Sequence, residues 1–186
     1  WLVLVTHPLL DAFTSYGTQL WWPLRPTPAS WSSVFIIDPF YTLPLLGGVL
    51  IALAVGPRPR VSRALGWLLI VGAGYLLASL AAKHWAENRV QNMLAEQGRR
   101  PVAMFSVPQP FNIVLWRVVA RMEDGNYVEA ITGMLDSRQP EHIEFPSNAA
   151  LGAALQPRDA IEGLRWFAND WLRYDEINDQ LVVSDL

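Results

Sequence analysis

A histidine and an aspartate stand four residues apart near the start of the chain, at His7 and Asp11. On a helix, side chains at this spacing share one face, and Thr14 and Ser15 would follow one turn later. An imidazole and a carboxylate placed in this way can bind one divalent metal ion together. They can equally bind each other as a hydrogen-bonded pair, and the spacing alone leaves both interpretations open.

The surrounding sequence is typical of a membrane protein. From Trp1 to Ala82 there are only two acidic residues, Asp11 and Asp38, against four arginines. A carboxylate at membrane depth is costly unless it is paired, so such residues usually line a site, a pathway or a protein interior. This setting favours a metal site over a structural pair, and a third interpretation places both His7 and Asp11 outside the bilayer.

Composition divides the chain into two halves. It has 186 residues, 52% of them hydrophobic, no cysteine and a net charge of −3. Residues 1–82 carry four basic and two acidic residues, whereas residues 83–186 carry ten and fifteen. The acidic second half argues against nucleic-acid binding, and without cysteine any metal must be bound through nitrogen and oxygen. Because the chain opens with tryptophan inside an apolar run, we expect it to be a fragment of a longer protein.

Two uncharged stretches are long enough to cross a membrane. As helices, residues 39–55 would extend about 25 Å and residues 64–82 about 28 Å, at about 1.5 Å per residue. Asp38 and Pro39 are typical of a helix start, as cap and first-turn residue. The loop between the stretches holds three arginines, which places it on the cytoplasmic side and everything after residue 82 on the outer side.

The predicted fold class is therefore α-helical transmembrane segments followed by a small soluble α+β domain. Residues 1–97 form the membrane-embedded region, with a polar helix over 1–17 that kinks or restarts at Pro8, the two spans, and a helical extension to 97. Residues 98–186 form the α+β domain. Its expected strands are 112–121, 127–135, 143–145, 171–174 and 181–183, and its expected helices are 147–155 and 157–168.

Several short motifs together point to a family. His7 to Gly17 reads HPLLDAFTSYG and is followed by Trp22-Pro23, by Phe35-Ile36-Ile37-Asp38-Pro39 and by Thr42-Leu43-Pro44. These residues resemble the bacterial membrane-bound metal-dependent hydrolases, also described as LexA-regulated inner-membrane hydrolases. The resemblance implies a multi-span protein of the inner membrane that binds a divalent metal ion, zinc being expected. The family's earlier segment of the kind His-Arg-Gly-x-Thr-His is not in these residues.

The resemblance also assigns roles by position. His7 and Asp11 match an H-x-x-x-D pattern and Asp38 matches I-D-P, so these three residues are the expected metal ligands. Asp38 is also the candidate catalytic residue, as a general base that orients water, although its role as a helix cap needs no metal. His84 beside a predicted span is typical of an interfacial residue, and His142 of a solvated strand edge.

We therefore expect an integral membrane metal-dependent hydrolase, placed in the bilayer and acting on a small-molecule or lipid-like substrate. A phosphoester of lipid or cell-envelope type is the preferred substrate, because of the membrane placement. The alternative is a non-catalytic membrane protein in which the His/Asp pair fixes helix packing. In that case the extracytoplasmic α+β domain binds a partner.

Overall fold

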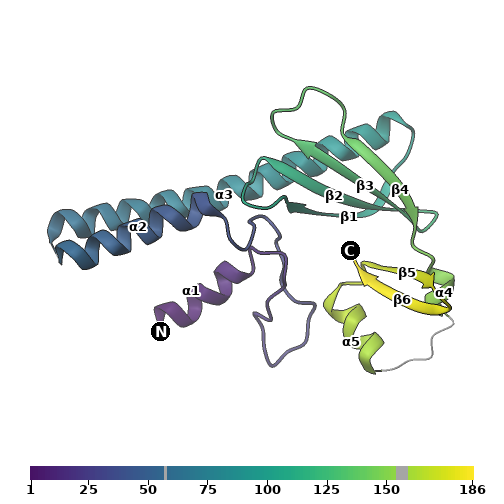
Figure 1. The fold of residues 1–186 in the computed structure, drawn as a ribbon, viewed down its shortest axis with the longest axis horizontal. Coiled ribbons are helices and arrows are strands. Elements are labelled where there is room, and N and C mark those ends of the chain that lie inside the picture. The colour runs from purple at the N-terminus through teal and green to yellow at the C-terminus, as the bar shows by residue number, and fades with distance from the viewer. Residues whose placement is uncertain (57, 154–158) are drawn as a thin grey trace.

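The structure, a computed structural model, describes residues 1–56, 58–153 and 159–186. Its first half is helical, with α1 (Leu2–Asp11), α2 (Pro39–Val55) and α3 (Pro59–Glu96). In Figure 1, α2 lies alongside the first part of α3 as a hairpin, and α3 continues past α2 to lie along the sheet. The chain thus has a long apolar helix joined to a small domain of helices and strands. The predicted number of membrane spans stays a prediction.

The first and last parts of α3 have different surroundings. It has 38 residues and is long and apolar enough to cross a membrane, whereas α1 and α2 are shorter apolar helices. At about 1.5 Å per residue α3 extends about 57 Å, roughly twice the hydrocarbon core of a bilayer. Its first part exposes large apolar side chains such as Trp67 and Ile70. Its last part is buried against the sheet through Val90 and Leu94, so the predicted helical extension to residue 97 is part of the same helix.

Four antiparallel strands form the main sheet in the order β1-β2-β3-β4. The strands are β1 (Pro101–Pro108), β2 (Leu115–Met122), β3 (Asn126–Gly133) and β4 (Glu141–Pro146). Alternate residues of β2 and β3, including Trp116, Val118 and Val128, bury their side chains against α3, as period-two alternation requires. The expected hairpin of β2 and β3 and the short strand at β4 are present, whereas β1 is not among the predicted strands.

A second, smaller unit lies against the other face of this sheet. It contains α4 (Ala149–Ala153), α5 (Asp159–Phe167), β5 (Leu172–Ile177) and β6 (Gln180–Asp185). Trp171 packs with Val119 and Tyr127 of the sheet, and the Tyr127 hydroxyl donates to the Leu172 carbonyl at 3.0 Å. The closing hairpin turns at Asn178 and Asp179 as predicted. The two predicted helices are present within the described residues, and the parts predicted for 154–158 lie outside them.

The polar helix is shorter than expected. α1 runs without interruption through Pro8 and ends at Asp11, six residues before the predicted end at Gly17. The chain folds back after α1, and amides of residues 31–33 bind the backbone carbonyls that a longer helix would have used. The Trp31 amide donates to the Ala12 carbonyl at 2.7 Å, and the Ser33 amide donates to the Phe13 carbonyl at 2.8 Å. Thr14 and Ser15 therefore lie in the loop that follows α1 instead of on its face.

Candidate functional site

The His7 and Asp11 side chains meet on one face of α1. His7 Nε2 lies 3.3 Å from Asp11 Oδ2, and the two side chains are 72% and 48% exposed. The contact follows from the spacing of four residues, so the prediction that they share a helix face is confirmed. In water an exposed pair of this kind stabilises a helix by only about 0.3–0.5 kcal/mol. The contact therefore contributes little to the stability of the protein.

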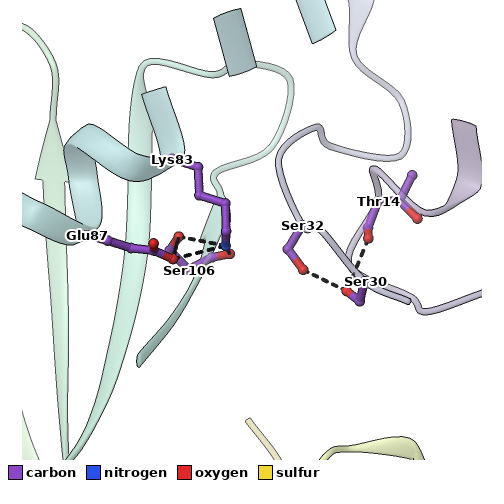
Figure 2. A network of polar contacts seen from close by, with 6 residues as sticks. All are labelled: Thr14, Ser30, Ser32, Lys83, Glu87 and Ser106. Carbon is purple, nitrogen blue, oxygen red and sulfur yellow. Dashed lines mark hydrogen bonds and ion pairs between the residues drawn. The ribbon is translucent and has the colours of Figure 1, made fainter. Parts of the chain in front are cut away.

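Hydroxyl groups hold the end of α1 against the returning loop, as Figure 2 shows. The Thr14 hydroxyl donates to the Asp11 carbonyl at 2.7 Å, which caps the last turn of the helix. The Ser30 hydroxyl donates to the Thr14 carbonyl at 3.2 Å and lies 2.7 Å from the hydroxyl of Ser32. These bonds fix the backbone that carries the Asp11 carboxylate.

Asp38 is a buried helix cap. Only 1% of the residue is exposed, and its Oδ1 accepts hydrogen bonds from the amides of Phe40 and Tyr41 at 2.9 and 3.2 Å. Its Oδ2 accepts a hydrogen bond from the Tyr75 hydroxyl of α3 at 2.7 Å. The predicted cap at the start of α2 is confirmed. Sequence reasoning did not find Tyr75, because no local pattern links residues so far apart in the chain.

The structure brings together two of the three expected metal ligands. His7 and Asp11 are adjacent, but in residues 1–56, 58–153 and 159–186 no three His, Cys, Asp or Glu side chains are grouped so that they could hold a metal ion. Asp38 therefore does not join the pair. A catalytic zinc site takes three protein ligands, and the described residues bring only His7 and Asp11 together. His84 and His142 are exposed side chains elsewhere on the surface.

A second polar network joins α3 to the edge strand of the sheet, also shown in Figure 2. Lys83 Nζ donates to the Ser106 carbonyl at 2.8 Å and to its hydroxyl at 2.9 Å, and lies 3.2 Å from Glu87 Oε1. The Ser106 hydroxyl in turn donates to Glu87 Oε1 at 2.8 Å. A serine beside a lysine is a known nucleophile arrangement. Ser106 has no exposed surface, so here the network fastens β1 to α3.

One comparison with known proteins concerns the helical half. Residues 1–86 match a family model described as YdjM inner membrane protein. This part of the chain is similar to a family of bacterial inner-membrane proteins. The matched residues hold α1, α2 and the apolar part of α3, with His7, Asp11 and Asp38 among them. The match agrees with the predicted membrane location and describes no reaction, and the four-stranded sheet lies outside it.

No curated protein and no solved structure matches the chain.

Proposed function

We propose that this chain is part of an integral membrane metal-dependent hydrolase in which His7 and Asp11 bind a divalent metal ion, with zinc as the expected ion. The observation that supports this proposal is their contact on α1. Zinc–nitrogen and zinc–oxygen bonds of about 2.0–2.2 Å at a tetrahedral angle separate two ligand atoms by about 3.4 Å. His7 Nε2 and Asp11 Oδ2 are 3.3 Å apart, a separation that fits two ligands of one ion.

The proposed metal site requires more ligands than His7 and Asp11. A catalytic zinc needs at least one protein ligand beyond His7 and Asp11. The predicted role of Asp38 as ligand or general base would have to use the little acceptor capacity that three donors leave on this carboxylate, and the residue is only 1% exposed. We therefore assign Asp38 a positioning role, in which it holds α2 against α3.

The chemistry follows from the donor types. When bound, a divalent ion lowers the pKa of a coordinated water and polarises a phosphoryl or carbonyl oxygen of the substrate. His7 supplies a neutral nitrogen ligand and Asp11 a negative oxygen ligand, and the bond from Thr14 to the Asp11 carbonyl holds that turn in place. A phosphoester of lipid or cell-envelope type is the proposed substrate, because the similar family is one of inner-membrane proteins.

Metal content of the full chain, purified in mild detergent, tests the proposal by elemental analysis. We expect a bound divalent ion that is lost in His7→Ala and in Asp11→Ala. The matched control is His84→Ala, which removes another exposed histidine outside α1 and should leave the ion in place. Absence of metal from the unmodified chain, or equal metal content in all four proteins, would overturn the proposal.

A second candidate function is a non-catalytic membrane protein whose α+β domain binds a partner on the outer side of the membrane. The observation that favours it is the buried core between α3 and the sheet, which fixes the domain rigidly to the apolar helices. In this case His7 and Asp11 form only a surface pair. The elemental analysis separates the two candidates, because the second predicts no metal and a loss of at most about 0.5 kcal/mol of stability in His7→Ala.

A further inference from the structure

A cleft of about 390 Å³ lies where three parts of the fold meet. Its walls come from the loop after α1, from β1 and β2 of the sheet, and from the unit that contains α5 and β6. The loop and α5 are tied together, because Trp166 Nε1 donates to the carbonyls of Arg25 and Pro26 at 3.3 and 3.1 Å. The cleft has the size of an ordinary small-molecule site and contains neither His7 nor Asp11.

Aromatic rings form one wall of the cleft. Tyr16 is 75% exposed and Phe167 is 38% exposed, and the two rings meet edge to face with centroids 5.7 Å apart. Deeper in the cleft, Phe105 and Trp171 make a second edge-to-face contact at 4.5 Å. The exposed Tyr16 ring offers an apolar face with a hydroxyl at its end, a combination that suits a ligand with both apolar and polar surface.

Residues with hydrogen-bonding side chains line the rest of the cleft. Ser15, Thr27 and Asn169 all line the cleft and carry hydroxyl or amide groups. A hydroxyl can donate and accept, and a side-chain amide can do both at once. Such groups match a ligand that carries several hydroxyls of its own.

The charges in the cleft argue against an anionic ligand. Of the described residues that line it, Arg117 is the one basic residue. Its Nε and Nη2 donate to the two carboxylate oxygens of Glu129 at 2.9 and 3.0 Å, so this positive charge is already neutralised. Asp185 also lines the cleft, and burial raises the pKa of its carboxyl group. A phosphate would meet this carboxyl group without a free cation to balance it.

We propose that the cleft binds a neutral carbohydrate, which stacks on the Tyr16 ring and exchanges hydrogen bonds with Ser15 and Asn169. The sugar face carries C–H groups that pack on an aromatic ring, and its rim carries hydroxyls for the surrounding polar groups. This site is independent of the His7 and Asp11 pair.

The test uses the full chain in phosphatidylcholine nanodiscs, because detergents with sugar headgroups would compete for the cleft. A panel of neutral oligosaccharides is screened beside phosphorylated forms of the same sugars, and bound sugars are then measured by titration calorimetry. We expect a neutral sugar to bind, and Tyr16→Ala to weaken binding about tenfold through loss of the stacking face. Tyr16→Phe keeps the ring and should stay within about threefold of the unmodified chain.

The matched control is Trp21→Ala, which removes an exposed ring from the same loop outside the cleft and should leave binding unchanged. A glycolipid that carries the same sugar as its headgroup shows where the natural ligand comes from. Tighter binding of the glycolipid than of the free sugar indicates a membrane glycolipid, and equal binding indicates a soluble glycan. The proposal is overturned if no neutral sugar binds, if only phosphorylated sugars bind, or if Tyr16→Ala binds as well as the unmodified chain.

Discussion

The hydroxyl of Tyr75 on α3 donates a 2.7 Å hydrogen bond to Oδ2 of Asp38, the buried cap of α2. This single contact joins the start of one apolar helix to the middle of the next. We predict that Tyr75→Phe lowers the free energy of unfolding by about 1–3 kcal/mol, because it leaves a buried carboxylate oxygen without its partner. Thermal unfolding in detergent measures the effect. Tyr16→Phe, which removes an exposed hydroxyl, should change the stability little, and equal effects would contradict the assigned role of Tyr75.

Two adjacent glycines on α2 provide a matched test of helix packing. A Cβ atom added at Gly48 would lie 2.5 Å from Leu68 Cδ1 and 3.0 Å from Leu65 Cδ2, whereas one added at Gly47 meets nothing within 4 Å. We predict that Gly47→Ala stabilises the protein by about 0.5–1 kcal/mol, since alanine favours the helix. Gly48→Ala should lose that gain, because the ends of the Leu68 and Leu65 side chains must shift to make room. Unfolding of both variants under the same conditions gives the comparison, and equal stabilities would contradict a close contact here.

The ion pair between Arg117 and Glu129 should make stability depend on pH. The Arg117 guanidinium holds the pKa of the Glu129 carboxyl below its ordinary value of 4.5. The pair therefore stabilises the fold above that ordinary value, and its contribution is lost as the pH falls through the lowered pKa. We predict that Glu129→Gln is less stable than the unmodified chain at pH 7 and that the difference shrinks towards zero in strong acid. Denaturant unfolding at several pH values measures it.

The control for this prediction is Glu141→Gln on the neighbouring strand β4, where the carboxylate is exposed. It should change the stability little at either end of the pH range. A difference between Glu129→Gln and the unmodified chain that stays constant with pH would show that Glu129 acts by packing and not by its charge.

Local signals account for what could be predicted from the sequence. The cap at Asp38, the turn at Asn178 and Asp179, and the contact of His7 with Asp11 all depend on residues within four positions of one another. They appear in the structure as expected. The apolar composition of α3 similarly predicted a helix suited to a membrane.

Long-range contacts account for what could not be predicted. α1 ends early because the Ala12 carbonyl accepts a hydrogen bond from the Trp31 amide. No property of residues 7–17 predicts that Trp31 is the hydrogen-bond partner. β1 has proline at both ends and little alternation, so only its pairing with β2 and its bonds to Lys83 define it as a strand. The cleft likewise combines segments from both ends of the chain, including Tyr16 and Phe167.

The side of the membrane on which the α+β domain lies can be tested directly, because the chain contains no cysteine. The three arginines between the predicted spans place that loop in the cytoplasm, so the sheet should face outward. We predict that Ser137→Cys, at an exposed position between β3 and β4, reacts with a membrane-impermeant maleimide on intact cells. Ser62→Cys, exposed in the first turn of α3, should react only after the membrane is opened. The reverse pattern would place the sheet in the cytoplasm, and labelling of both from outside would exclude a helical hairpin that enters and leaves the bilayer.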